Sequence, residues 1–326
     1  MDTNTFQPRT DFSALHEGVE AIREQIGKVI VGQHQMIDLL LAGLLVQGHV
    51  LIEGVPGVAK TLTAKLLAQC VDADFSRIQF TPDLMPADVL GTSVFNPQTR
   101  VFEYKKGPIF GNLVLIDEIN RAPAKTQSAL FEVMEERQIT NDGNTYLLDR
   151  PFMVIATQNP IEQEGTYRLP EAQLDRFLFK IEVKYPDLQE EVAVLLRMHE
   201  FNGETDLTGM IGKVVTATQI IAFQQLVRQV RIDEKLLHYI AAIVHETRMN
   251  ASLYLGASPR ASIAVMNCAK AMAAMRNRDF VIPEDVVEMV PHVLRHRIML
   301  TPEKEMEGIR ADDVIAQIIK MVEVPR

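Results

Sequence analysis

The chain lacks the features that mark disulfide-stapled, membrane-spanning and exported proteins. Only two cysteines occur among 326 residues, Cys70 and Cys268, and both fall in apolar helical patterns. This predicts buried free thiols in a reducing compartment and excludes a disulfide framework. The longest apolar stretch, residues 36–46, is interrupted by Asp38 and is too short to span a bilayer. The N-terminus has no basic region followed by an apolar core, so we expect no secretory signal and a cytoplasmic location.

Basic charge and aromatic side chains are also scarce. Lysine and arginine number 33 against 43 aspartates and glutamates, the formal net charge is −10, and aromatics make up 6% of the chain. General nucleic-acid binding needs a basic surface, so we do not expect nucleic acid as a partner. The short basic run at residues 295–297 is interpreted as a solvated helix end. With 47% hydrophobic and 23% charged residues, the composition is that of an ordinary globular protein, and the length predicts two domains.

A glycine-containing octet follows the apolar run at residues 49–52 and fits the pattern G-x-x-x-x-G-K-[ST] except at Ala59. Such a loop turns sharply, so that backbone N–H groups point at phosphate oxygens, the lysine reaches the β- and γ-phosphates, and the hydroxyl binds Mg²⁺. The apolar spacing after the octet predicts a helix, which favours this interpretation over a chance glycine–proline turn. The expected nucleotide-binding residues here are Gly54, Val55, Pro56, Gly57, Val58, Ala59, Lys60, Thr61 and Leu62.

Two carboxylates end a second apolar run, at residues 113–116. Four apolar residues followed by Asp117 and Glu118 predict a buried parallel strand whose acids lie at its carboxyl end, where ligands bind in open α/β sheets. Asp117 is placed to hold the hydration shell of Mg²⁺, and Glu118 to deprotonate the attacking water. An N-cap for the next helix is the alternative for an isolated pair of acids, and the upstream phosphate loop favours catalysis.

Strand and helix patterns alternate over the first half of the chain and predict a parallel α/β sheet. We expect strands at 49–53, 75–80, 113–117, 152–157 and 178–183, and helices at 12–26, 36–47, 60–71, 125–137 and 171–176. Residues 91–104 and 138–148 interrupt the alternation and predict two projecting hairpins, which serve either as contact elements or as plain structural ribbons.

From Tyr185 onward the pattern is helical throughout. We expect helices at 190–201, 217–230, 233–248, 259–275 and 283–290. Pro186 and the loop at residues 202–212 mark the boundary. The chain is therefore divided into an α/β nucleotide-binding domain at 1–186 and an α-helical domain at 187–326.

Three further polar residues stand out. Asn159 follows a buried strand at 152–157, between the phosphate loop and Glu118, although an Asn-Pro pair is also a turn signal. Arg176 lies in Leu-Asp-Arg-Phe at a helix end, where a local ion pair is its alternative role. Arg260 follows Ser258, a good N-cap, and Pro259, so it falls in a first helical turn that disfavours a cation and suggests a nearby anion.

Together these residues resemble the AAA+ ATPases and, among them, the MoxR family, which is similar to the magnesium-chelatase I subunit. The resemblance runs from Val31-Gly32-Gln33 to Arg260 and beyond. It implies a P-loop core with a C-terminal helical lid, a nucleotide base near Gly32, Walker A at Lys60 and Thr61, and Walker B at Asp117 and Glu118. It also implies that Asn159 is sensor 1, Arg176 a trans-acting arginine finger, and Arg260 sensor 2. Arg168 is the alternative finger.

The resemblance further implies ATP hydrolysis with Mg²⁺ by a homo-oligomeric ring, which we expect to be a hexamer. MoxR relatives are chaperones that mature protein complexes, often with a partner that carries a von Willebrand factor A domain, so a protein client is expected. Two other functions compete with this one. A P-loop phosphotransferase would need an acceptor pocket, and a nucleotide-gated binding scaffold would not need Glu118 as a base.

Overall fold

The computed structural model describes residues 10–55, 57–159, 167, 169–201 and 207–325. The chain divides into two compact units, Ala21–Ile221 and Met1–Glu20 with Ala222–Arg326. We call the first the α/β unit and the second the helical unit, and we describe each by itself. Helices α1 (Ser13–Gly27) and α8 (Ala217–Arg228) run across the division in sequence. The domain boundary at 186/187 remains a prediction.

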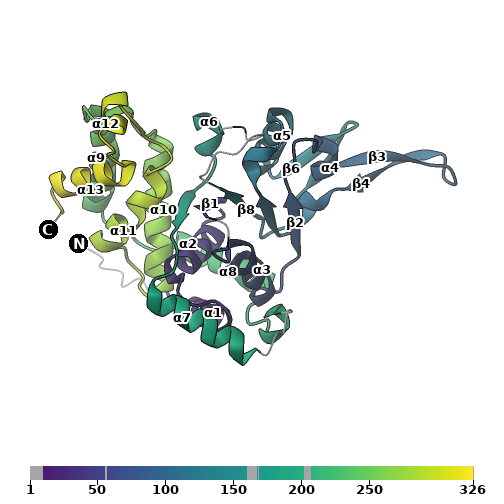
Figure 1. Ribbon diagram of the computed structural model, residues 1–326, viewed down its shortest axis with the longest axis horizontal. Helices are drawn as coiled ribbons and strands as arrows, with labels where there is room; N and C mark the ends of the chain where they lie inside the picture. The colour runs from purple at the N-terminus through teal and green to yellow at the C-terminus, as the bar shows by residue number, and fades with distance from the viewer. Residues whose placement is uncertain (1–9, 56, 160–166, 168, 202–206, 326) are drawn as a thin grey trace, which may run out of the picture. The chain divides into compact units, whose positions relative to one another are not determined.

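The α/β unit is built on a five-stranded parallel sheet with the order β2-β5-β8-β1-β9 (Figure 1). The strands are β1 (Val50–Gly54), β2 (Phe75–Gln79), β5 (Leu113–Asp117), β8 (Met153–Gln158) and β9 (Phe179–Val183). All five predicted strands are confirmed within one residue at either end. Parallel pairing aligns their carboxyl ends at one edge, so the loops that follow β1, β5 and β8 meet there.

Helices bury both faces of this sheet, which explains the unbroken apolar runs at 50–52, 113–116 and 153–156 in its central strands. On one face, Val114 and Val154 share a core with α5 (Ala124–Glu136). On the other face α2 (His34–Leu45) approaches closely, since a Cβ at Gly43 would lie 3.0 Å from Val50 and 3.1 Å from Met153. Helix α3 (Lys60–Cys70) packs along β2 and β5.

Both predicted hairpins are present and are joined to each other. The first, β3 (Gly91–Asn96) with β4 (Val101–Lys106), reaches away from the sheet (Figure 1). The second, β6 (Gln138–Asn141) with β7 (Asn144–Leu147), directly follows α5. Asn141 donates a 2.8 Å hydrogen bond to Ser93, and Tyr104 stacks on Tyr146 with 4.4 Å between ring centroids. The base of the long hairpin is therefore braced, while Phe95 and Phe102 near its end are exposed.

The remaining elements of the α/β unit are short, apart from one helix. They are α4 (Pro86–Leu90), the 3-10 turns at Pro108–Phe110, Ile119–Arg121 and Leu207–Met210, α6 (Glu171–Leu174) and α7 (Leu188–Glu200). Helix α6 ends two residues before the predicted end at Arg176, because Phe177 already leads into β9.

The helical unit packs α10 (Pro259–Met275) against α9 (Glu234–Met249) and α11 (Pro283–Leu294), and is completed by α12 (Pro302–Met306) and α13 (Ala311–Met321). Buried alanines along α10 allow its neighbours to approach closely. The prediction of helix throughout is wrong at one place. Strands β10 (Leu253–Leu255) and β11 (Met299–Leu300) form a two-stranded ribbon, a pairing between segments too far apart in sequence for a local pattern to reveal.

Two further expectations for this unit are corrected. Helix α11 continues through Pro291 to Leu294, although a proline removes one helical hydrogen bond and crowds the preceding turn, and Arg295 N bonds to Pro291 O at its end. The basic run at 295–297 is not a solvated helix end. His296 is buried, and the mostly buried Arg295 pairs with Asp312 of α13 at 3.0 Å, so this segment joins two helices.

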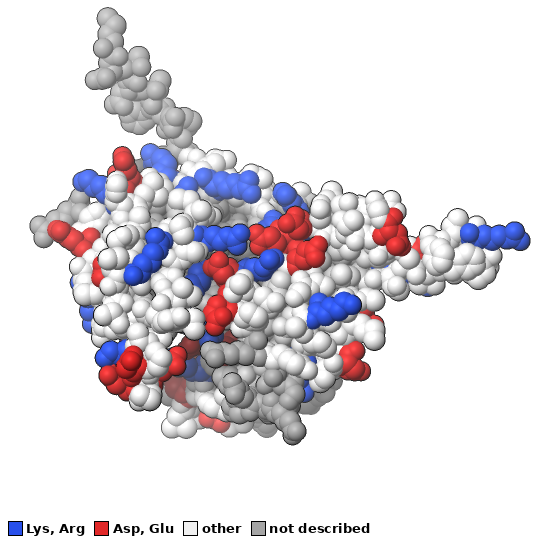
Figure 2. Space-filling view, turned by 90° about the horizontal axis from the view of Figure 1, so that it is seen from above, with Lys and Arg blue, Asp and Glu red and all other residues white. Residues whose placement is uncertain are grey.

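Charged side chains are distributed in two different ways. On the face drawn in Figure 2, basic and acidic side chains are interspersed, and the end of the projecting hairpin is basic.

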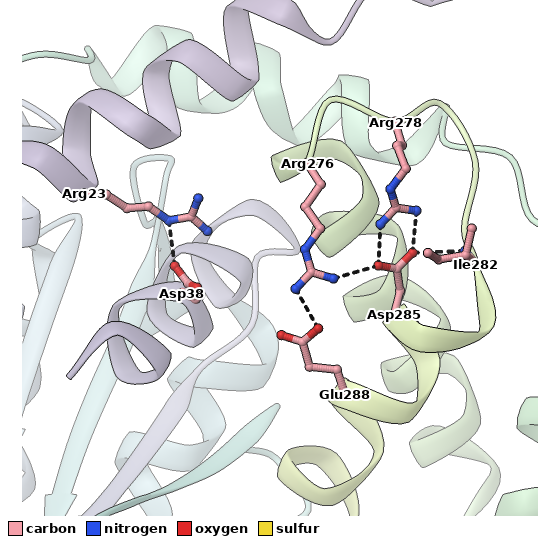
Figure 3. Close-up of polar contacts among 7 residues, drawn as sticks. All are labelled: Arg23, Asp38, Arg276, Arg278, Ile282, Asp285 and Glu288. Atoms are coloured by element: carbon pink, nitrogen blue, oxygen red, sulfur yellow. Dashed lines mark hydrogen bonds and ion pairs between the residues drawn. The ribbon is translucent and has the colours of Figure 1, made fainter. Parts of the chain in front are cut away.

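Inside the helical unit a buried carboxylate is fully paired: Asp285 accepts two hydrogen bonds from Arg278, one from Arg276 and one from the backbone N–H of Ile282 (Figure 3). Among the described residues, no helix combines the length and the apolar character needed to cross a membrane.

Candidate active site

The predicted phosphate loop lies between β1 and α3. Gly54 is the last residue of β1 and Lys60 the first of α3, so the loop leads from the carboxyl end of a central strand into a helix N-terminus. Ala59 is the N-cap and adopts a left-handed conformation (φ 57°, ψ 20°). The glycine of the general pattern takes this conformation without strain, which explains the preference for it there. Pro56 lies outside the described residues.

Gly54 is small for a reason that the sequence did not suggest. A Cβ on Gly54 would lie 2.9 Å from the carbonyl oxygen of Val183, its register partner on β9. The residue is therefore required by the close approach of the neighbouring strand rather than by the turn of the loop. The left-handed turn is made later, at Gly57 (φ 88°) and Ala59.

Lys60 folds back over the loop, and its Nζ donates a hydrogen bond to the Gly54 carbonyl oxygen. Partial burial lowers the pKa of Lys60, and the nearby carboxylates of Asp117, Glu118 and Glu53 oppose that shift. The ammonium group thus lies within the field of the acidic pair that ends β5, as the prediction for a shared site requires.

The first turn of α3 brings Thr61 to Asp117, the last residue of β5. Thr61 Oγ1 donates to Asp117 Oδ1 at 3.2 Å, and Thr157 Oγ1 donates to the same oxygen at 3.1 Å. A hydroxyl and a buried carboxylate at this separation are ligands that Mg²⁺ accepts. Within the described part of the chain no group of three or more His, Cys, Asp or Glu side chains is arranged to hold a metal. A magnesium ion here would therefore depend on water and phosphate for its other ligands.

Glu118 is held in an unusual backbone conformation at the end of β5. Its φ of 56° and ψ of 51° are left-handed, and its backbone N–H donates to Thr157 Oγ1 at 3.1 Å. The carboxylate accepts a 3.0 Å hydrogen bond from Gln79 and lies 3.1 Å from Arg121 Nε. A non-glycine residue held in this region commonly marks a functional position. The acid is thereby fixed at the edge of the sheet without being buried.

Asn159 and Arg176 occupy different surroundings within the α/β unit. Asn159 directly follows β8, and β8 lies between β1 and β5 in the sheet. The place of Asn159 between the phosphate loop and Glu118 stays a prediction. Arg176 Nη1 donates to the Phe131 carbonyl oxygen at 2.6 Å and lies 3.7 Å from Glu135. It therefore rests on α5 of its own chain. Arg168, the alternative finger, lies outside the described residues.

Arg260 lies in the first turn of α10, in the helical unit, as the sequence predicts. Ser258 is the N-cap residue, as predicted, and has the extended backbone of that position. Its hydroxyl, however, makes no capping hydrogen bond and is buried without a hydrogen-bond partner. The helix start is therefore set by Pro259, whose ring fixes φ in the helical range.

Gly32, the expected neighbour of the base, lines a small cavity of about 70 Å³ with residues of α1 and α2. The ion pair between Arg23 Nε and Asp38 Oδ1, at 2.7 Å, forms part of its wall (Figure 3). Gly32 has φ 65°, and a Cβ there would lie 2.4 Å from Glu190 Oε1. The left-handed conformation favours glycine, whereas the flexible Glu190 side chain could move away from a Cβ.

Four residues of the site were not identified from the sequence. Arg77, which lies on β2, donates a 2.6 Å hydrogen bond from Nε to Asp117 Oδ2. The other three are Gln79, Thr157 and Arg121, which contact the acidic pair as described above. Arg77 and Gln79 are two positions apart on a predicted strand, so their side chains lie on the same face. Nothing local identifies β5 as the neighbour of that strand, so their contacts could not be predicted.

Comparisons with known proteins agree with this geometry. A model described as "ATPase family associated with various cellular activities (AAA)" matches residues 49–179, and one described as "AAA lid domain" matches residues 245–318. The chain is 44% identical over 312 residues to chaperone MoxR1 of Mycobacterium tuberculosis, covering 93% of this chain and 81% of that one. The chain belongs to the MoxR family of AAA+ ATPases.

Two further proteins are similar to this MoxR-family chain over almost its whole length. An uncharacterised protein, YeaC of Bacillus subtilis, is 50% identical over 311 residues, covering 95% of this chain and 96% of the relative. A crystal structure of a candidate ATPase from Cytophaga hutchinsonii aligns with a TM-score of 0.89 at 44% identity, covering 97% of each chain. The predicted P-loop AAA+ core with a helical lid is thereby confirmed.

Proposed function

We propose that this MoxR-family protein binds ATP with Mg²⁺ and hydrolyses it to ADP and phosphate. The hydrogen bond between Thr61 and Asp117 carries the proposal, because it brings the phosphate loop and the acidic strand end into one site. Membership of an ATPase family supports the same reaction.

Each residue has a distinct role in this proposal. Lys60 binds the β- and γ-phosphates, and the residues of 54–62 other than Pro56 surround them with backbone N–H groups. Thr61 and Asp117 hold Mg²⁺, which neutralises phosphate charge when it is bound. Glu118 accepts the proton of the attacking water.

The other polar residues respond to the γ-phosphate. Asn159 contacts it from the end of β8 and orients the water. Arg176 is supplied to the site of an adjacent protomer, and Arg260 reads the nucleotide state from the helical lid. Gly32 lies near the base.

We further propose that the protein works as a homo-oligomeric ring, a hexamer, that remodels a protein client. The braced β3–β4 and β6–β7 hairpins support this, because β6 directly follows α5, on which Arg176 rests. A change at Arg176 can thus be transmitted to the exposed end of the long hairpin. A partner with a von Willebrand factor A domain belongs to the same proposal by family analogy.

The test is phosphate release by the purified protein with ATP and Mg²⁺ and without any acceptor. Hydrolysis should occur, and its rate should rise more steeply than linearly with protein concentration because adjacent protomers share sites. The Lys60→Ala variant should lose tight ATP binding, since it removes the main positive charge on the phosphates. ADP formation that requires an added acceptor, with the phosphoryl group found on that acceptor instead of in free phosphate, would indicate a phosphotransferase, and binding without turnover would indicate a nucleotide-gated scaffold.

A further inference from the structure

A single buried hydroxyl joins the two acids at the end of β5. Thr157, a residue of β8 that is 4% exposed, donates from Oγ1 to Asp117 Oδ1 at 3.1 Å and accepts the backbone N–H of Glu118 at 3.1 Å. A threonine hydroxyl has one proton to donate and lone pairs that accept, so it can make both bonds at once. One atom of β8 therefore holds two consecutive residues of the neighbouring strand end.

These bonds begin where the backbone pairing of β5 with β8 ends. Ile116 and Ala156 form the last pair in the register of the two strands. On the opposite side, the carbonyl oxygen of Asp117 still accepts a hydrogen bond from the N–H of Phe80, at 3.0 Å, next to β2. The side chain of Thr157 thus takes the place of the backbone ladder on the β8 side.

Glu118 has a backbone that needs such a restraint. Its left-handed conformation is disfavoured for residues other than glycine and persists where the surrounding bonds hold it. The carbonyl oxygen of Glu118 accepts from the N–H of Arg121 at 2.8 Å, and its own N–H donates to Thr157. Since the backbone sets the direction of the side chain, these two bonds also decide where the carboxylate points.

Asp117 receives three donors, and they differ in how securely they are placed. Thr61 and Thr157 donate to Oδ1, and Arg77 donates to Oδ2. The Arg77 side chain is 55% exposed, and Thr61 is itself a proposed ligand of the metal. The hold of Thr157 on Oδ1 depends on neither solvent nor ligand, because the residue is buried within the sheet.

We propose that Thr157 is the positioning residue that sets Asp117 and Glu118 together. The inference rests on the proposed function, in which Asp117 holds Mg²⁺ and Glu118 takes the proton of the attacking water. The hydroxyl of Thr157 keeps Asp117 Oδ1 turned toward Thr61 and fixes the backbone that carries Glu118. A metal ligand and a base that would otherwise rotate separately are thereby kept in one arrangement.

Two substitutions separate this role from packing. Thr157→Val keeps the branched shape and removes the hydroxyl, whereas Thr157→Ser keeps the hydroxyl and removes a buried methyl group. Positioning predicts an impaired valine variant and a serine variant like the parent, and packing alone predicts the reverse order. The control, Thr126→Val, removes the hydroxyl of another buried threonine, which donates to the Leu84 carbonyl oxygen at 2.7 Å, and should behave like the parent.

Phosphate release over a Mg²⁺ titration at saturating ATP measures the effect on the site. In Thr157→Val, turnover should fall about tenfold or more, the effect of losing one hydrogen bond to a charged group. The Mg²⁺ concentration for half-maximal turnover should rise at least about threefold, because Asp117 loses a donor that orients it. ATP affinity measured with the metal chelated should stay within about threefold of the parent, since Lys60 and its loop are unchanged.

Amide hydrogen exchange of Glu118 tests the geometry without nucleotide or metal. Its N–H should exchange at least about tenfold faster in Thr157→Val than in the parent, and Thr157→Ser should match the parent. Equal exchange in all three proteins would overturn the inference. A valine variant with the turnover and Mg²⁺ dependence of the parent, or a serine variant as impaired as the valine variant, would overturn it as well. A parent that releases no phosphate would overturn the proposed function, and the exchange rates would still decide whether Thr157 holds Glu118.

Discussion

Glu118 combines a left-handed backbone with a carboxylate that two side chains hold in place. The strained backbone aims the acid at the edge of the sheet, and Gln79 and Arg121 restrict its rotation. A residue fixed in this way can take the proton of the attacking water with little reorganisation of its own side chain.

The Glu118→Gln variant separates this role from binding. The amide oxygen can still accept hydrogen bonds from Gln79 and Arg121, but it cannot take a proton from water. We expect ATP affinity within about threefold of the parent and turnover reduced by about 100-fold or more. Equilibrium titration and phosphate release measure the two quantities. Turnover at the parent rate would place the base elsewhere.

His49 predicts a pH dependence of stability. Val154 N–H donates to its Nδ1, so the proton is on Nε2 and is donated to the Met134 carbonyl oxygen. Burial lowers the pKa of His49 to about 4, and the positive charge of Arg137 acts in the same direction. The folded state thus keeps the ring neutral, while the unfolded chain takes up a proton below about pH 6.5.

The stabilising contribution of neutral His49 is therefore complete above pH 6.5 and is lost as the pH falls toward 4. The loss of this contribution between pH 7 and pH 5 should lower the free energy of unfolding by about 2 kcal/mol. Denaturant titrations of the parent and of His49→Gln at both pH values measure this. The pH-dependent loss should be smaller by that amount in the variant, and equal losses would contradict the assignment.

At the scale of elements, the start of α11 depends on Asp285. The fully buried carboxylate joins Arg276 and Arg278 to the backbone N–H of Ile282, and Glu288 pairs with Arg276 nearer the surface (Figure 3). Hydrogen bonds that involve a charged, buried acceptor contribute more than exposed ion pairs do. The inner carboxylate should therefore stabilise the helical unit more than the outer one.

We expect Asp285→Asn to lower the free energy of opening α11 by about 2–3 kcal/mol, because the buried charges of the arginines lose their counterion. Glu288→Gln, the matched control one turn away, should cost less than about 1 kcal/mol. Native-state hydrogen exchange in α11 measures both. Similar effects of the two substitutions would mean that burial does not decide the strength of this network.

At the scale of the whole molecule, the ring proposal predicts complementation between two inactive variants. Arg176→Ala and Glu118→Gln should each be nearly inactive, because arginine fingers contribute about 10³-fold or more in other nucleotide hydrolases. In mixed rings, some interfaces pair an intact Arg176 with an intact Glu118, so phosphate release should partly return.

The mixture needs evidence that the two variants co-assemble, which differential labelling and energy transfer provide. A mixture that co-assembles and stays inactive would show that Arg176 acts within its own protomer, consistent with its contacts to Phe131 and Glu135. The same experiment would then be repeated with Arg168→Ala.

Much of this protein follows from its sequence alone, because its strands, phosphate loop and hairpins are specified by local patterns. The apolar runs before Gly54 and Asp117 predicted where two strands end, and parallel pairing brings the carboxyl ends of strands to the same edge of a sheet. The tertiary structure alone decided the partners of those residues. Arg77 and Thr157 reach Asp117, and Val183 requires Gly54 to be small, because strand order and register bring together residues far apart in sequence. The hydroxyl of Thr157 follows the same rule, since the sequence places it near the end of a strand while the neighbouring strand decides that it holds Asp117 and Glu118.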